Sequence, residues 1–124
     1  MGVYTHGTQM PPPSPESFLP LTAVVFEILL ALSGGDLHGY DIMREVDSRS
    51  GGSVSLHAGT LYRALARLLD QRLIEELDER AGDDDERRRY YRLTPLGRAV
   101  ARAEVDRLAG QVSAARRLFR GGRT

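Results

Sequence analysis

Apolar residues occupy nearly every face of the stretch 21–33, "LTAVVFEILLALS", and this pattern predicts a buried α-helix. Thr22 can cap the start of this helix, and Gly34 and Gly35 can end it because glycine tolerates a positive φ. A helix without a polar face has to be covered on more than one side. The first helix therefore predicts a second apolar surface beyond its own domain, such as a dimer provides.

The next helix is predicted over residues 39–49, with Tyr40, Met43 and Val46 on one apolar stripe and Ile42 beside it. In this arrangement Tyr40 packs against the third helix with its hydroxyl group at the rim. The alternative is that the hydroxyl group reaches a phosphate.

A third helix is predicted over residues 58–71, where Leu61, Leu65 and Leu68 recur at i, i+4 and i+7 and form a ridge that faces the core. The opposite face is polar and carries His57, Thr60, Arg63 and Arg67.

Two short strand candidates, "LIEELDER" (73–80) and "RRRYYRL" (87–93), flank the acidic run "AGDDDE" and predict a hairpin with an acidic tip. Alternation along the returning strand places Arg88 and Arg92 on the face opposite Leu93. Because Leu93 is expected to point inward, these two arginines are expected to face phosphate. The alternative is intramolecular pairing of acids and arginines within the hairpin, which contributes little at a surface.

Thr94 and Pro95 provide the N-cap and first position of a last helix that runs to about residue 119. Its later apolar positions are spaced 3, 4, 3 and 4 residues apart, which is a coiled-coil seam of two heptads. A helix that projects from a small domain can bury such a seam only against a partner. The seam residues are Val105, Leu108, Val112, Ala115 and Phe119.

The formal net charge of zero conceals a polarity along the chain. Residues 1–74 carry five Arg against seven acids, residues 75–86 one against eight, and residues 87–124 eleven against two. The basic C-terminal third suits a polyanionic partner. All 17 basic residues are arginine, which reflects either codon usage or phosphate recognition.

Composition also excludes several classes of site. The chain has no cysteine, so disulfides, thiolate metal ligands and a cysteine nucleophile are excluded. The three histidines lack metal-ligand spacing, and no carboxylate stands in a recognisable catalytic constellation. No apolar run approaches the ~20 residues of a membrane-spanning helix. We therefore expect a cytoplasmic protein that is not an enzyme and uses no metal or cofactor.

The elements suggest four segments. Residues 1–19, rich in proline, read as a flexible arm, and residues 20–94 as one folded domain. Residues 95–119 form the C-terminal helix, and residues 120–124 a flexible tail.

Three short helices followed by a hairpin are the order of a winged helix-turn-helix. The predicted fold class is thus mainly α with a small β-hairpin, namely a winged helix-turn-helix plus a C-terminal dimerisation helix. In this geometry the third helix enters the major groove and the hairpin lies along the backbone of double-stranded DNA. Residues 20–94 are thus the predicted DNA-binding domain. The start of the third helix, with Gly59 and open backbone N–H groups, suits a phosphate. The predicted DNA contacts are Tyr40, Ser55, His57, Gly59, Thr60, Tyr62, Arg63, Arg67, Arg88 and Arg92.

The motifs "LHGYDIM", "GTLYRALARL", "LI" and "DDDERRRYYRLTPLGR" resemble those of the PadR family of bacterial transcriptional regulators. The resemblance covers about residues 21–119 and fits the short subfamily with one C-terminal helix. It implies a homodimeric repressor that binds pseudo-palindromic operator DNA and is often released by a small effector. It also implies dimerisation through the first and last helices, here Phe26, Leu29, Leu30, Val105, Leu108, Val112, Ala115 and Phe119.

One position departs from the family pattern, because Arg72 stands before "LI" where such proteins usually have glycine. Either Arg72 takes a left-handed conformation at a steric cost of about 1 kcal/mol, or the helix ends differently. An effector pocket would lie between the first and last helices of the dimer, with Phe18, Phe26, Leu108 and Phe119 as candidate wall residues.

Two other functions fit the same pattern. One is another winged-helix regulator, of the MarR type. The other is a protein-interaction module that uses the winged fold and the seam without binding DNA.

Overall fold

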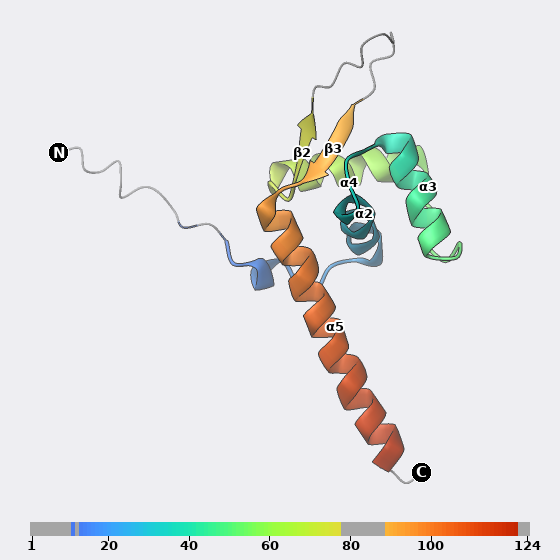
Figure 1. Ribbon diagram of the computed structural model, residues 1–124, viewed down its shortest axis with the longest axis vertical. Helices are drawn as coiled ribbons and strands as arrows, with labels where there is room; N and C mark the ends of the chain where they lie inside the picture. The colour runs from blue at the N-terminus through green and yellow to red at the C-terminus, as the bar shows by residue number, and fades with distance from the viewer. Residues whose placement is uncertain (1–10, 12, 78–88, 122–124) are drawn as a thin grey trace, which may run out of the picture.

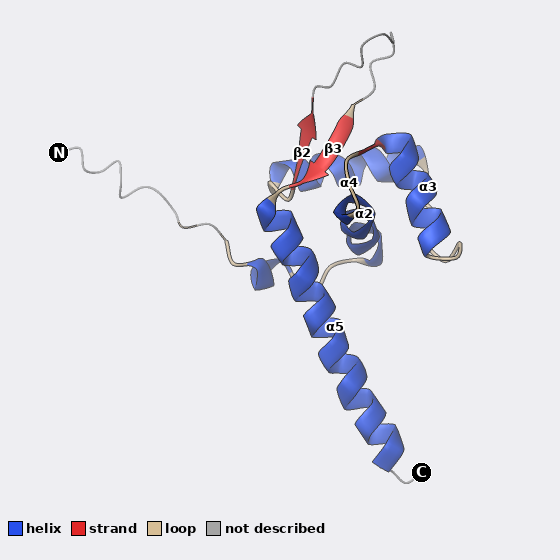
Figure 2. Ribbon diagram, in the orientation of Figure 1, coloured by secondary structure: helices blue, strands red, loops and turns tan. Residues whose placement is uncertain are grey.

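The structure is a computed structural model that describes residues 11, 13–77 and 89–121. It shows a winged domain from which one long helix projects (Figure 1). The mainly helical composition with one small antiparallel sheet confirms the predicted fold class (Figure 2). The elements in chain order are η1 (Pro15–Phe18), α2 (Ala23–Ser33), β1 (Leu37–His38), α3 (Gly39–Arg49), α4 (Ala58–Asp70), β2 (Ile74–Leu77), β3 (Tyr90–Leu93) and α5 (Pro95–Gly121).

Helix α2 lies at the centre of the winged domain, between α3 and α5 (Figure 1). The Thr22 side chain caps it as predicted, accepting a hydrogen bond from the Val25 N–H at 3.1 Å. Ile28, Leu29 and Leu32 are buried completely or almost so, and they form the middle of the core. In the part of the chain that the structure describes, no helix is both long and apolar enough to cross a membrane.

Helices α3 and α4 form the helix-turn-helix pair, with the bounds that the sequence predicts to within one residue. The predicted leucine ridge of α4 is confirmed, since Leu61, Leu65 and Leu68 are at most 1% exposed. The predicted stripe of α3 is confirmed at Val46, which is buried, and at Met43, which is partly buried against the core. It is wrong at Tyr40, which lies outside the core, because Gly39 is the buried residue at this end of the helix.

The sheet has three strands in the order β1-β3-β2, not the two of the predicted hairpin. Strand β1 has only two residues, too few to show an alternation in the sequence, and it pairs Leu37 with Tyr91 and His38 with Tyr90. The predicted inward face of β3 is confirmed, because Tyr91 and Leu93 are buried. Strand β3 is thus the central strand of the sheet.

Helix α4 ends in a left-handed turn at Arg72, whose φ is 61°. The N–H of Leu73 donates to the carbonyl of Leu68 and the N–H of Arg72 to that of Leu69, each at 3.0 Å. These two bonds are those of a Schellman motif, in which the left-handed residue is usually glycine. The structure therefore favours the first of the two alternatives, and Arg72 bears the strain.

Helix α5 begins against the same turn. The Thr94 hydroxyl group accepts a hydrogen bond from the Gly97 N–H at 2.9 Å, which confirms it as the N-cap. The hydroxyl group also donates to the Arg72 carbonyl at 2.7 Å. A Cβ atom added to Gly97 would overlap the carbonyl oxygen of Leu73, so only glycine permits this close approach.

Part of the predicted flexible arm is ordered, because residues 15–18 form η1 and pack against α5. We call residues 13–21 the strap. Its end is bound to α5 by the Leu21 N–H, which donates to the Glu104 carboxylate at 3.1 Å. Glu104 is 2% exposed and also accepts two hydrogen bonds from Arg107, at 2.6 and 2.9 Å.

The strained turn predicts that Arg72→Gly stabilises the protein by about 1 kcal/mol, because glycine adopts a positive φ without a Cβ clash. The free energy of unfolding from urea titration at one fixed protein concentration measures the gain. Gln71→Gly is the matched control, since Gln71 has a φ of −83° and gains nothing from glycine. Equal or lower stability of Arg72→Gly would show that the turn is unstrained.

We predict that the hydrogen bonds of the Glu104 carboxylate contribute to stability in a pH-dependent way. Its hydrogen bonds from Arg107 are the main cause that lowers its pKa, against the opposing effect of burial. The contribution is complete above the unfolded pKa of ~4.3 and is lost as the pH falls through the lower folded pKa. We expect Glu104→Gln to lower the free energy of unfolding by about 1–3 kcal/mol at pH 7, a difference that shrinks below about pH 4. Urea titrations from pH 3 to 7 measure it, with exposed Glu75→Gln as control; a difference that is the same at every pH would refute the prediction.

Candidate nucleic-acid interface

The face of α4 opposite the leucine ridge carries most of the predicted DNA contacts, and most of them are exposed. Its N-cap, His57, makes no hydrogen bond to the first turn with its side chain. The backbone N–H groups of this turn are therefore open to an acceptor at the positive end of the helix. Thr60 is partly buried at this end. The exposed residues of the predicted set on and before α4 are Ser55, His57, Gly59, Tyr62, Arg63 and Arg67.

Arg63 and Arg67 stand one turn apart on this face. Neither has an ion-pair partner among the residues that the structure describes. A guanidinium group with five open donors can bind a phosphate or the edge of a guanine. The structure thus brings together on one exposed helix the residue types that DNA recognition needs.

Tyr62 has a structural role beside any contact with DNA. A Cβ atom added to Gly39 would overlap its hydroxyl group, so the Tyr62 ring lies directly on the first residue of α3. The ring remains 49% exposed. Tyr62 therefore sets how closely α4 approaches α3, and Gly39 provides the room.

Tyr40 lies outward on α3 and is 59% exposed, so the predicted packing against the third helix is wrong. The Arg44 guanidinium lies over its ring, 5.6 Å from the centroid, in a cation–π contact. Arg44 is not among the predicted contacts, although its i+4 spacing from Tyr40 is visible in the chain. This pair places a phenol hydroxyl and a guanidinium together on the exposed side of the helix-turn-helix.

Arg92 points outward as predicted, but its guanidinium is engaged within the chain. Its Nε and Nη2 donate to the two carboxylate oxygens of Asp36 at 3.1 and 2.9 Å. These hydrogen bonds lower the pKa of Asp36. Arg92 therefore joins β3 to the segment before β1, and nothing in the sequence pattern indicates Asp36 as its partner. Arg88, the other predicted wing contact, lies outside the described residues.

Arg89 and Glu76 form an ion pair at 3.2 Å across β2 and β3, as the intramolecular alternative for the hairpin predicts. Tyr91 pairs with Glu76 in the register of the sheet and is buried, and this burial is the main cause that raises its pKa, with Glu76 adding to the rise. The base of the wing is thus held by a buried phenol and a surface ion pair.

His38 connects the start of α3 to the wing. Its Nδ1 accepts the Asp41 N–H at 3.4 Å, and its Nε2 lies 3.1 Å from the Asp41 carboxylate. The ring meets Tyr90 edge to face, with 5.3 Å between centroids. His38 therefore orients the helix-turn-helix and the wing relative to each other.

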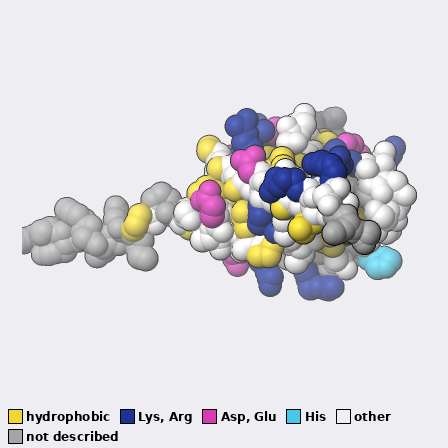
Figure 3. Space-filling model, turned by 90° about the horizontal axis from the view of Figure 1, so that it is seen from below, with side chains coloured by type: hydrophobic (Ala, Val, Ile, Leu, Met, Phe, Trp, Pro, Cys, Tyr) yellow, Lys and Arg dark blue, Asp and Glu magenta, His cyan; other side chains and the backbone are white. Residues whose placement is uncertain are grey.

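The predicted seam of α5 is uncovered in the single chain. Val105 and Val112 are 47% and 49% exposed and Phe119 is 85% exposed, while Leu108 and Ala115 are partly buried. Figure 3 looks from the C-terminal end of α5, where apolar side chains and arginines lie side by side. This face therefore presents both apolar and basic side chains.

The first helix contributes less to this surface than predicted. Phe26 and Leu30 are partly buried and can contribute to it. Leu29 is fully buried in the core of its own chain, so its side chain cannot reach a second copy.

The described part of the chain contains no group of three or more His, Asp or Glu residues that could hold a metal ion. The one buried acid in this part, Glu104, accepts hydrogen bonds from Arg107 and from the strap, so it is not a free buried carboxylate.

Comparison with known proteins shows which family this chain resembles. Residues 28–103 match the model of the transcriptional regulator PadR-like family. An uncharacterised 37.1 kDa protein in a transposon of Streptomyces fradiae is 40% identical over 88 residues, which are 68% of this chain. The chain spans only 24% of that protein.

Solved structures agree with the family model. A PadR family transcription regulator from Clostridium difficile matches with a TM-score of 0.66 and 25% identity, over 81% of this chain and all of that one. Bacillus subtilis PadR in complex with operator DNA matches with a TM-score of 0.57 and 26% identity, over 72% of this chain and 48% of that one. The match to the PadR model decides against a MarR-type regulator. The chain belongs to the PadR-like family of transcriptional regulators.

Proposed function

We propose that this protein is a transcriptional repressor that binds pseudo-palindromic operator DNA as a homodimer in the cytoplasm. Helix α4 enters the major groove, and the wing formed by β2 and β3 lies along the backbone. The observation that carries the proposal is the two-sided structure of α4. One face is a buried leucine ridge, and the other presents Arg63 and Arg67 without ion-pair partners in the described chain.

The proposed DNA contacts fall into two kinds, those that reach into the groove and those that bind the DNA backbone. Arg63 and Arg67 are the candidates for base edges and phosphates in the groove. Tyr40 with Arg44, His57 and the first turn of α4 are candidates for the backbone. That the relative from Bacillus subtilis was solved in complex with operator DNA supports the binding of DNA in this proposal.

The homodimer is supported by the uncovered seam of α5. A second copy of the seam would bury the exposed side chains of Val105, Val112 and Phe119. Each two-fold dimer presents two α4 helices, and a pseudo-palindromic operator with half-sites about one helical turn apart matches that symmetry. Release by a small effector is part of the same proposal.

The competing function is a protein-interaction module that uses the winged fold without DNA. A salt titration of binding to a duplex selected from random sequence separates the two. Contacts to ~6–10 phosphates should weaken binding by ~10³–10⁵ between 50 and 200 mM salt. A flat response, or failure to select any duplex, would favour the interaction module.

Arg63→Ala should weaken binding to the selected duplex by about 1–3 kcal/mol and reduce the preference over a scrambled duplex, because a base contact is lost. Fluorescence anisotropy with both duplexes measures the two effects. Arg116→Ala, which removes the same charge from the exposed far end of α5, should leave the preference unchanged. An unchanged preference in Arg63→Ala would exclude this residue from base recognition.

Leu108→Asp should raise the dissociation constant of the dimer by more than about 100-fold, because a charge would be buried in an apolar interface. Sedimentation velocity at micromolar concentration measures the change in mass. Ser113→Asp, on another face of the same helix, should remain dimeric. If the wild-type protein sediments as a monomer, the proposed dimer is wrong.

A further inference from the structure

Four exposed arginines lie along one side of α5. They form two pairs of equal spacing, Arg98 with Arg102 and Arg116 with Arg120. The second pair follows the first by 18 residues, which is about five full turns and about 27 Å, so both pairs lie on the same side of the helix. We call these four residues the arginine face.

No acid compensates the charge of the arginine face within the described chain. None of its guanidinium groups has an ion-pair partner among the described residues. Helix α5 has two acids: Glu104 is buried and bound by Arg107, and Asp106 lies about 60° around the helix from the centre of the face. The face therefore concentrates positive charge in a chain whose formal net charge is zero.

The positions of these arginines do not favour the helix itself. Like charges four residues apart repel each other on a helix surface, and the face contains two such pairs. Arg98 also lies close to the N-terminus of α5, where the helix dipole disfavours a cation and no acid stands in the first turn. The local stability of α5 thus does not explain the arrangement, whereas a polyanionic partner does.

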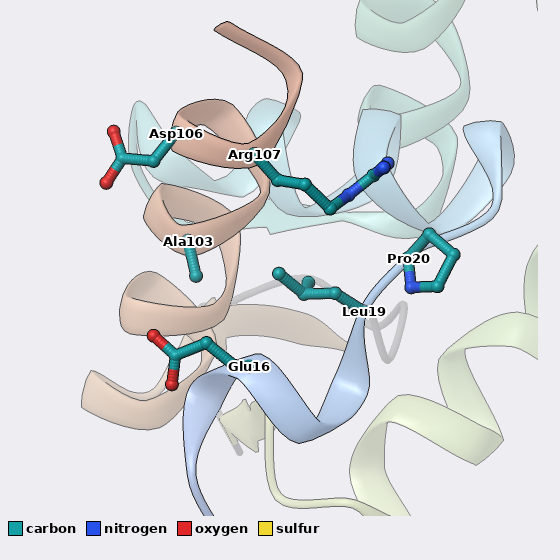
Figure 4. Close-up of a pocket in the computed structure, with 6 residues that line it drawn as sticks. All are labelled: Glu16, Leu19, Pro20, Ala103, Asp106 and Arg107. Atoms are coloured by element: carbon teal, nitrogen blue, oxygen red, sulfur yellow. The ribbon is translucent and has the colours of Figure 1, made fainter. Parts of the chain in front are cut away.

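The arginine face lies apart from the covered sides of α5. Helix geometry places its centre about 80° from the centre of the seam and about 140° from the side that carries Ala103 and Arg107. In Figure 4, Leu19 and Pro20 of the strap face the turns that carry Ala103 and Arg107. A second copy on the seam therefore leaves the arginines exposed, beside the interface but outside it.

The place of α5 in the molecule narrows the choice of polyanion. Strands β2 and β3 lie at one end of the molecule and the C-terminal end of α5 at the other, so a duplex on α4 and the wing does not reach Arg116 and Arg120 (Figure 1). An anionic bilayer takes up apolar side chains together with basic ones. In the proposed dimer the second copy covers the adjacent seam. Phosphates of a second duplex, in contrast, need only the charge.

We propose that the arginine face binds a second DNA duplex without sequence preference. The guanidinium groups contact phosphates, and the small exposed side chains of Ala109 and Ser113, between the two pairs, let the duplex approach α5 closely. Four such contacts are weak alone, but DNA that flanks the operator is tethered at a high effective concentration. The joining of two DNA segments thus rests on the proposed function, because α4 holds the first one.

Capture on beads tests the proposal with the full chain. The selected duplex is immobilised and saturated with protein, and a fluorescent scrambled duplex is added at about 50 mM salt, where phosphate contacts are strong. We expect the scrambled duplex to be retained by beads that carry protein and not by beads without it. Retained protein with no captured duplex would overturn the proposal.

A variant in which alanine replaces all four arginines of the face should capture less scrambled duplex by about tenfold or more, because the phosphate contacts are lost. Its affinity for the selected duplex should equal that of the wild type, and replacement by four lysines should retain capture. Equal capture by the alanine variant would overturn the proposal. If the wild type selects no duplex, the proposed function is wrong, and anisotropy of the scrambled duplex with both proteins then tests the face directly.

A single acid locates the second duplex on α5. Ala109→Asp places a carboxylate between the two arginine pairs and should weaken capture severalfold. Gln111→Asp changes the net charge equally, but it lies about 160° around the helix from the centre of the face and should leave capture unchanged. Equal effects of the two variants would place the duplex elsewhere and refute the site.

Vesicles of phosphatidylglycerol test the competing partner. We expect the protein to remain in the supernatant when the vesicles are sedimented. Co-sedimentation that the alanine variant loses, without capture of duplex by the wild type, would assign the arginine face to a membrane and overturn the proposal.

Discussion

The two residues Arg72 and Leu73 orient the three functional parts of the molecule. The Leu73 N–H closes the end of α4, and the Leu73 carbonyl accepts the N–H of Thr94 at 3.1 Å, where β3 ends. The Arg72 carbonyl accepts the Thr94 hydroxyl group, and Gly97 packs against the Leu73 carbonyl. Helix α4, the wing and α5 thus meet at one turn, and the left-handed conformation of Arg72 is the condition for all of these contacts.

The arginines that the structure describes include two sets with different roles. Arg49, Arg89 and Arg92 pair with acids elsewhere in the fold. Arg107 pairs within α5 with Glu104, which in turn binds the strap. Arg63 and Arg67 are not paired within the described chain and face outward from α4. The distinction depends on the tertiary neighbours of each arginine. For this reason the net charge of a segment is a weak guide to where a polyanion binds.

Helical periodicity was sufficient to predict the four long helices and the leucine ridge, because each signal repeats over several turns. The packed face of α3 differs from the pattern only at its start, where Tyr40 is apolar enough to extend the stripe although Gly39 faces the core. Strand β1 and the strap are too short to carry a period. The partners Asp36–Arg92 and Glu104–Leu21 are separated by 56 and 83 residues, and no local pattern records such contacts.

The two halves of α5 have different roles, and their order along one helix fixes how the dimer seam is rotated relative to the winged domain. Its first half is anchored to the winged domain through Val100, Ala101 and Glu104, while the seam follows from Val105 onward. The helix is continuous between these halves, so it fixes their relative rotation. One residue inserted after Glu104 would turn the seam by about 100° relative to the winged domain. In the proposed dimer the two α4 helices would then fall out of phase with the turns of the duplex, although every side chain on them remained unchanged.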